Sequence, residues 1–195
     1  MAEHFPQQTP TVIIPATPEC ITTERLLLRP MQKTDAPGIF ALRSRPAMSA
    51  LFPPDQSVQD TEKWMRGKLL TTPDASGAIH RQFQFVIMQI DDPSGQIIGT
   101  TGLNALSPAA SIGYGLLPEF HGRGYATEAV GGVVGAWRRL ARVEVEPGMQ
   151  ERLFACCNKE NRGSARVLEK TGFCRYDEVL GDKGEIVVLW RLDVP

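Results

Sequence analysis

Apolar and polar residues recur along the chain with spacings that predict a mixed α/β domain. Strand-like apolar runs lie at 21–31, 82–90, 96–103, 110–117, 153–157, 173–179 and 185–192. Apolar residues at helical spacing lie at 35–45, 57–70, 127–141 and 161–171. The strands between 82 and 117 follow one another closely, which favours an antiparallel meander.

A strand–helix–strand crossover is predicted after this meander. The run from 110 to 157 reads as strand, glycine loop, helix and strand, which produces a right-handed parallel pair. We therefore expect an α/β (α+β) domain whose mostly antiparallel sheet of about six or seven strands contains one parallel pair, flanked by about four helices. Gly131, Gly132 and Gly135 weaken the helix by ~1 kcal/mol each, so close packing against the sheet is expected to offset them.

The first twenty residues differ from the rest. They contain Pro6, Pro10, Pro15 and Pro18 and lack a basic region followed by an apolar core. This composition predicts a flexible segment over 1–20 and not a secretory signal. The folded domain is expected to cover 21–195.

Composition and charge exclude several classes of function. The net charge of −1 does not imply a broad basic surface for nucleic acid. No run approaches the ~18–20 apolar residues that a membrane span requires. The chain has four cysteines without a CxxC pair, and its three histidines are scattered, so free thiols and no metal site are expected. These features fit a cytoplasmic monomer or homodimer.

The loop before the long helix carries the candidate chemistry. Gly122 and Gly124 let the backbone curl so that amides point inward, and the helix that follows adds unpaired amides and a positive dipole end. His121 and Arg123 add charge at the rim. Such a loop suits a pyrophosphate.

Three kinds of phosphate-binding site are alternative interpretations of this loop. A P-loop requires Gly-Lys-Ser/Thr, whereas residues 124–126 read Gly-Tyr-Ala. A Rossmann fingerprint follows the first strand of its unit and has a third glycine where Thr127 stands here. The third alternative is a coenzyme A site.

Three blocks of sequence resemble the GNAT superfamily of N-acetyltransferases, in its RimJ/RimL-like branch. Residues 121–126 (HGRGYA) match the signature Gln/Arg-x-x-Gly-x-Gly/Ala except at the first position. Residues 161–164 (NRGS) and 167–173 (VLEKTGF) are similar to the branch's second block, and 23–30 (TERLLLRP) to its first strand. The blocks occur in the family's order over roughly 21–192.

The resemblance implies acetyl-CoA as co-substrate and a primary amine, either a protein N-terminus or a small molecule, as acceptor. It implies that the strands 110–117 and 153–157 splay apart to admit the pantetheine arm, and that a backbone amide at Leu116 or Leu117 polarises the thioester. Asn161 would contact the cofactor or fix its helix. The candidate cofactor-binding residues are Leu116, Leu117, His121, Gly122, Arg123, Gly124, Tyr125, Ala126, Thr127, Asn161 and Ser164.

The candidate catalytic residues are fewer. The resemblance makes Ser164 the proton donor to the leaving sulfur, and Glu185 or Glu119 would hold a water that acts as base, with Tyr114 lining the site. Each has a structural alternative: a helix cap for Ser164, surface or strand-edge charge for the two glutamates, and core packing for Tyr114.

Two rival functions remain open. Many GNAT enzymes have a tyrosine where Leu168 stands, so a sensor or scaffold that binds acyl-CoA without turnover is the alternative. A nucleotide-binding module is a third. Asp55, Glu144 and Glu146 border the expected acceptor site and would attract a cationic amine, unless they are solvated loop charges.

Overall fold

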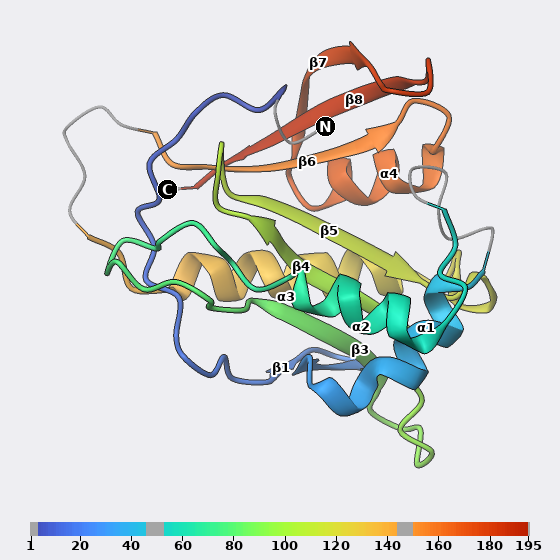
Figure 1. Cartoon of the computed structure of the whole chain (residues 1–195). Coiled ribbons are helices and arrows are strands. Elements are labelled where there is room, and N and C mark those ends of the chain that lie inside the picture. Colours follow the sequence, from blue (N-terminus) through green and yellow to red (C-terminus); the bar gives the residue numbers. More distant parts are fainter. Residues whose placement is uncertain (1–3, 46–52, 144–149, 195) are drawn as a thin grey trace.

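The central feature of the computed structural model is one open sheet of eight strands. The structure describes residues 4–45, 53–143 and 150–194. The strand order is β1-β2-β3-β4-β5-β6-β8-β7 (Figure 1). The strands are β1 (Ile21–Thr22), β2 (Leu26–Pro30), β3 (Gln84–Gln89), β4 (Gly99–Ala105), β5 (Ser111–Leu116), β6 (Arg152–Asn158), β7 (Cys174–Leu180) and β8 (Ile186–Asp193).

Only the pairing of β5 with β6 is parallel, and these two strands diverge. Their register contains a single pair, Ser111 with Phe154, and the Phe154 amide donates to the Ala110 carbonyl at 2.8 Å. All other neighbouring strands pair antiparallel over two or more residues. The predicted meander and splayed parallel pair are confirmed.

The sheet has one strand more than the seven runs in the sequence, because the first run is divided by a turn. The Thr23 amide donates to the Leu26 carbonyl at 2.9 Å, and the Thr23 hydroxyl bonds both the amide and the carbonyl of Leu26. The chain therefore folds back on itself after Thr22, and β1 pairs with β2.

Four α-helices cover the two faces, as expected. Helices α3 and α4 lie on one face and α1 and α2 on the other (Figure 1). Ser57 caps α2 by accepting the Asp60 amide at 3.2 Å. The helices are α1 (Ala36–Arg43), α2 (Val58–Arg66), α3 (Tyr125–Arg139) and α4 (Arg162–Lys170), with short 3-10 helices η2 (Lys33–Asp35) and η4 (Pro118–Phe120).

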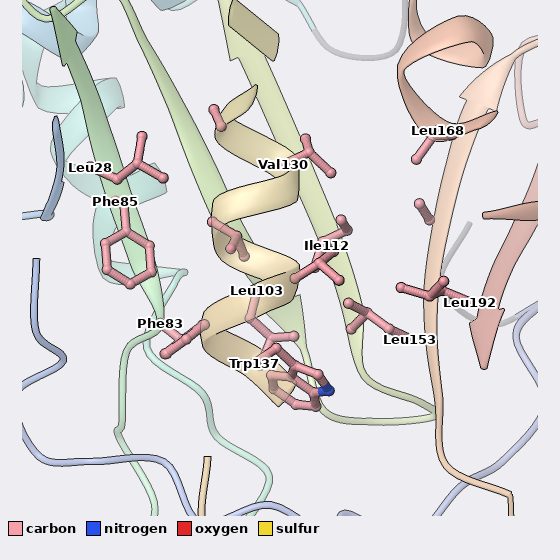
Figure 2. Packing of buried hydrophobic residues seen from close by; sticks show 14 of the residues in the cluster. Leu28, Phe83, Phe85, Leu103, Ile112, Val130, Trp137, Leu153, Leu168 and Leu192 are labelled. Carbon is pink, nitrogen blue, oxygen red and sulfur yellow. The ribbon is translucent and has the colours of Figure 1, made fainter. Parts of the chain in front are cut away.

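The main core lies between the sheet and the α3–α4 layer. Phe83, which directly precedes β3, packs against Phe85 of β3 and Trp137 of α3. Leu103 of β4 belongs to the same cluster, and Leu168 of α4 lies near β6 (Figure 2). A Cβ on Gly132 would lie 3.2–3.3 Å from side chains of β1 and β2 and the turn between them. The predicted close packing therefore applies to Gly132. Gly131 has open space around it and Gly135 only the end of the Arg139 side chain.

The described part of the N-terminal segment packs against the domain through residues 5–14, which differs from the expected flexible lead-in. Phe5, Val12 and Ile14 are 6%, 1% and 2% exposed. The Ile13 amide donates to the Ala141 carbonyl at 2.8 Å, and the Ile14 amide to Asp74 at 2.8 Å. The prolines prevent regular structure in this segment, but the apolar residues between them still bury their side chains.

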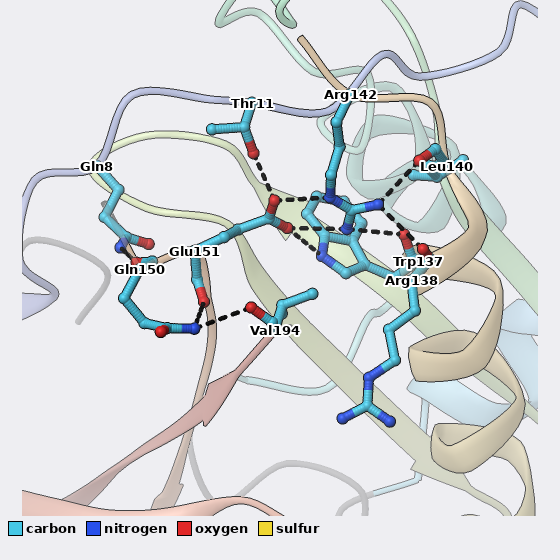
Figure 3. A network of polar contacts seen from close by, with 9 residues as sticks. All are labelled: Gln8, Thr11, Trp137, Arg138, Leu140, Arg142, Gln150, Glu151 and Val194. Carbon is cyan, nitrogen blue, oxygen red and sulfur yellow. Dashed lines mark hydrogen bonds and ion pairs between the residues drawn. The ribbon is translucent and has the colours of Figure 1, made fainter. Parts of the chain in front are cut away.

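Glu151 joins this segment to α3 and β6. Its carboxylate accepts hydrogen bonds from the Thr11 hydroxyl at 2.5 Å, the Trp137 indole at 2.9 Å and the Arg142 guanidinium at 2.7 and 3.0 Å (Figure 3). Burial raises the pKa of Glu151, but bonds from Arg142, Thr11 and Trp137 outweigh it and hold the pKa below its ordinary value.

Candidate active site

The divergence of β5 from β6 leaves one edge of β5 unpaired. The Leu117 amide donates to the Ile98 carbonyl at 2.8 Å, on the β4 side. Successive residues of a strand point their amides to opposite edges, so the backbone groups of Leu116 and Tyr114 face β6. Of the two amides predicted to meet the pantetheine arm, the structure therefore leaves Leu116 available and engages Leu117 within the sheet.

The loop that follows β5 leads into an uncapped helix. Gly122 and Gly124 have φ of +75° and +82°, a left-handed backbone that favours glycine. The Glu128 amide donates the first helical hydrogen bond, to the Gly124 carbonyl at 3.0 Å. The amides of residues 125–127 come before it and have no acceptor within the helix. Among the residues that the structure describes, no side chain caps α3. This end of α3 therefore presents free amides and a positive dipole end, which suit an anion.

Two residues outside the predicted cofactor-binding and catalytic sets, Glu128 and Arg25, fix this loop. Glu128 accepts the Thr23 hydroxyl at 2.6 Å, the Arg25 amide at 2.7 Å and the Arg25 Nε at 2.8 Å. Arg25 also donates to the Arg123 carbonyl at 3.0 Å. Burial raises the pKa of Glu128, but bonds from Thr23 and Arg25 outweigh it and lower the pKa. The β1–β2 turn thus holds the glycine loop from outside.

Tyr125 anchors the first turn of α3 through its side chain. Its ring is buried, the Arg25 guanidinium lies 4.7 Å from its centroid, and its hydroxyl accepts from the Gln89 side-chain amide at 2.9 Å. Only its backbone remains for a cofactor. Ala126 and Thr127 lie in the same turn, and their contact with a cofactor stays a prediction.

His121 contacts the strand edge itself. Its Nε2 lies 2.9 Å from the Leu116 carbonyl, and since a carbonyl only accepts, this nitrogen carries the proton. The ring is therefore on the open side of β5. A carbonyl has a second lone pair, so the contact leaves room for another donor at Leu116.

The structure brings Tyr114 and Ser164 together across the gap. The Tyr114 hydroxyl donates to the Ser164 carbonyl at 3.0 Å, which joins β5 to the start of α4. Burial raises the pKa of Tyr114 well above its ordinary value, against the opposing effect of this hydrogen bond. Tyr114 therefore stays neutral and acts as a donor here.

Asn161, and not Ser164, is the cap of α4. The Asn161 side chain accepts the Ser164 amide at 2.9 Å. Of the two roles expected for Asn161, the structure shows the one that fixes the helix. The Ser164 hydroxyl does not cap this helix, and its role as proton donor stays a prediction.

The two candidate carboxylates lie in different places. Glu119 is exposed on η4, directly after β5, and its carboxylate lies 3.7 Å from Arg45. Glu185 precedes β8, and its carboxylate accepts the Lys183 amide of its own turn at 3.0 Å. Strand β6 separates β8 from the gap, so the structure does not bring Glu185 together with Ser164.

The α1–α2 face carries a neutralised acid. Asp55 accepts two bonds from Arg43, at 2.7 and 2.9 Å, and one from Thr61 at 2.6 Å. Burial raises the pKa of Asp55, and the bonds from Arg43 and Thr61 outweigh it and lower the pKa. Asp55 is thus committed to an internal ion pair instead of attracting a cationic amine. Glu144 and Glu146 lie outside the described residues.

The described residues form neither a metal site nor a membrane-spanning helix. Within residues 4–45, 53–143 and 150–194, no group of His, Cys, Asp and Glu side chains has the geometry to hold a metal ion. No helix in that same part of the chain combines the length and apolarity needed to cross a membrane.

Comparison with known proteins identifies the family. The family described as "Acetyltransferase (GNAT) domain" matches residues 25–174, and the chain belongs to it. This confirms the family and the acyltransferase class predicted from the sequence. No significantly similar sequence was found among curated proteins.

Solved structures share the fold at low sequence identity. A GNAT acetyltransferase from Bacillus anthracis has a TM-score of 0.68 and 20% identity, covering 90% of this chain and 98% of its own. The ribosomal L7/L12 α-N-protein acetyltransferase RimL, solved with coenzyme A, has a TM-score of 0.66 and 18% sequence identity. The match covers 90% of this chain and 98% of its own. Ribosomal-protein-S5-alanine acetyltransferase from Vibrio fischeri has a TM-score of 0.61 and 21% sequence identity, and the match covers 91% of this chain and 97% of its own. These neighbours agree with the RimJ/RimL-like sequence pattern.

Proposed function

We propose that the protein transfers an acetyl group from acetyl-CoA to a primary amine by direct attack of the amine on the thioester. The observation that carries this proposal is that the open strand edge and the anion-binding loop are continuous along the chain. The unpaired edge of β5 leads directly into the glycine loop and the free amides of α3. A diphosphate and an extended, amide-containing arm require these two features side by side.

Binding is divided between the loop and the strand. The amides of Gly122, Gly124 and Ala126 receive the diphosphate, and the exposed Arg123 side chain adds charge. The edge of β5 at Tyr114 and Leu116 pairs with the amides of the pantetheine arm as an added strand would. The Arg25–Glu128 pair holds the loop in this shape before the cofactor arrives.

Three groups then serve the chemistry. The Leu116 amide points into the gap and stabilises negative charge on the thioester oxygen. The Ser164 hydroxyl donates a proton to the leaving sulfur. An alkylammonium has a pKa of ~10 and no lone pair, so the amine must lose a proton; Glu119, through a water, is the carboxylate on this side of the gap.

The acceptor is a primary amine, either the α-amine of a protein N-terminus or a small molecule. The names of RimL and the S5-alanine acetyltransferase favour the first. Two observations favour a sensor that binds acyl-CoA without turnover: Leu168 is buried in the core where many relatives carry a tyrosine, and Glu185 is turned into its own hairpin.

Two assays separate these functions. We expect acetyl-CoA and CoA, but not ATP or NAD, to raise the melting temperature. We then expect an amine panel to release free thiol from acetyl-CoA in proportion to acetylated amine. Stabilisation without thiol release on any amine would identify a sensor, and stabilisation by ATP or NAD instead would refute the coenzyme A site.

A further inference from the structure

Lys68 places a cation beside the end of β4 and the middle of β5. It follows α2 by two residues, and its ammonium donates to the Asn104 side-chain oxygen at 2.6 Å. A Cβ on Gly113 would lie 2.5 Å from the Asn104 side-chain nitrogen, so the Asn104 amide lies directly against β5. The absence of a side chain at Gly113 makes room for this contact.

This cation has no counter-charge among the residues that the structure describes. Asn104, its hydrogen-bond partner, is neutral. The Trp64 ring lies 4.9 Å from the ammonium, and the same ring lies 4.3 Å from the Arg43 guanidinium. Arg43 is neutralised by Asp55, whereas Lys68 forms no ion pair in this part of the chain.

The surroundings of Lys68 favour an anion. The side chain is half-buried, and burial, with the nearby Arg43, lowers the pKa of Lys68 to about 8. A desolvated ammonium without a counter-charge is costly, and an anion brought beside it removes that cost. A cavity of about 360 Å³ is lined by Asn104 but not by Lys68; its titratable lining residues are Arg66 and His80, with no carboxylate.

The position of Lys68 fits the acceptor side of the gap. Helices α3 and α4 cover the other face of β5, where Tyr114 reaches Ser164. The α1–α2 face is therefore the one from which an amine can approach. Gly113 precedes Leu116 by three residues, ~10 Å along a strand, a span that one amino acid and its side chain can cover.

We propose that Lys68 recognises a carboxylate on the amine acceptor. This inference rests on the proposed function and names its substrate class: an amine that also carries an acidic group. The carboxylate comes either from a free amino acid or from an acidic side chain near the N-terminus of a peptide. In both cases it replaces Asn104 or joins it as the partner of the ammonium.

Matched acceptors test this proposal. Free amino acids are compared with their amides, and the peptide Ser-Glu-Ala-amide with Ser-Gln-Ala-amide, by kcat/KM for thiol release. A charge-assisted hydrogen bond predicts a preference of roughly tenfold for the acidic member of a pair. The pair that shows it identifies the source of the carboxylate. Equal rates in both pairs overturn the role of Lys68 while leaving the acetyltransferase proposal intact; no thiol release with any amine refutes both.

Variants assign the preference to the residue. Lys68→Met is expected to lower kcat/KM for the acidic acceptor roughly tenfold and to bring the acidic-to-neutral ratio near one. Lys68→Arg keeps the charge and should keep a ratio above one. Lys63→Met, an exposed lysine of α2, is the matched control and should leave the ratio unchanged. A wild-type ratio in a folded Lys68→Met protein overturns the proposal.

Discussion

At the scale of single residues, Asn161 and Ser164 at the start of α4 have different roles although they belong to one sequence motif. Asn161 and Ser164 stand together in the resemblance block, and both were candidates for cofactor contact. In the structure the Asn161 side chain is used as the helix cap. The Ser164 hydroxyl is not needed for that purpose, and the Ser164 backbone carbonyl accepts the Tyr114 hydroxyl across the gap. Substitution of Ser164 should therefore lower activity, whereas substitution of Asn161 should lower stability.

Ser164→Ala is expected to lower kcat roughly 100-fold, because a positioned proton donor contributes at least that much. The affinity for CoA and the melting temperature should change little. Steady-state kinetics, calorimetric titration with CoA and thermal unfolding measure these three quantities. A folded Ser164→Ala protein with wild-type kcat would remove Ser164 from the chemistry.

Asn161→Ala is the matched comparison at the other end of the same hydrogen bond. Loss of the cap is expected to cost about 1 kcal/mol of unfolding free energy, measured by urea denaturation. Any fall in kcat should be far smaller than that of Ser164→Ala. Equal stability of Asn161→Ala and wild type would contradict the capping role.

At the scale of elements, the glycine loop depends on strands remote from it in sequence. The turn between β1 and β2 supplies Thr23 and Arg25, and the end of β3 supplies Gln89. Arg25 and Glu128 are 103 residues apart. Their contacts hold both sides of the first turn of α3, so the diphosphate site is preformed and its ordering cost is reduced before binding.

Glu128→Gln is expected to weaken acetyl-CoA binding roughly tenfold, since the loop loses its charged anchor and must be ordered by the cofactor. The KM for the amine should stay unchanged, because the acceptor approaches from the other face. Calorimetric titration and kinetics give the two quantities. Glu169→Gln, an exposed acid of α4, is the control. An unchanged Kd in Glu128→Gln would show that the anchor has no part in cofactor binding.

At the scale of the whole molecule, Glu151 joins three distant parts of the chain. The N-terminal segment, the end of α3 and the start of β6 meet at its carboxylate (Figure 3). The β6 strand forms one wall of the gap. The same contacts therefore fix both the proline-rich segment and the base of the proposed cofactor site.

Glu151→Gln is expected to lower the unfolding free energy by about 2 kcal/mol at pH 7, because Arg142 loses its charged partner in a partly buried site. The folded-state pKa of Glu151 is lowered, so its stabilisation is present above the ordinary value of 4.5 and is lost as the pH falls through that value and below. Urea unfolding at several pH values should show the wild-type advantage shrinking below about pH 4.5. An advantage independent of pH would contradict the ionic role.

The sequence by itself determined most of the elements, the parallel pair and the glycine loop. These follow from local periodicity, turn residues and motif spacing, which act over a few residues, whereas the splay of the parallel pair was implied by the resemblance to the GNAT family. It also pointed to Ser164, Tyr114 and the loop amides. It predicted a flexible N-terminus because prolines exclude regular structure, yet they do not prevent burial of Val12 and Ile14.

Only the tertiary structure decided which groups meet. It directed the Leu117 amide to β4 and left that of Leu116 in the gap, turned Glu185 into its own hairpin, and paired Asp55 with Arg43. It also joined Arg25 to Glu128 and left Lys68 without a counter-charge among the described residues. Register, strand order and charge pairing depend on contacts between segments far apart in the chain. The spacing of residues along one sequence does not encode these contacts.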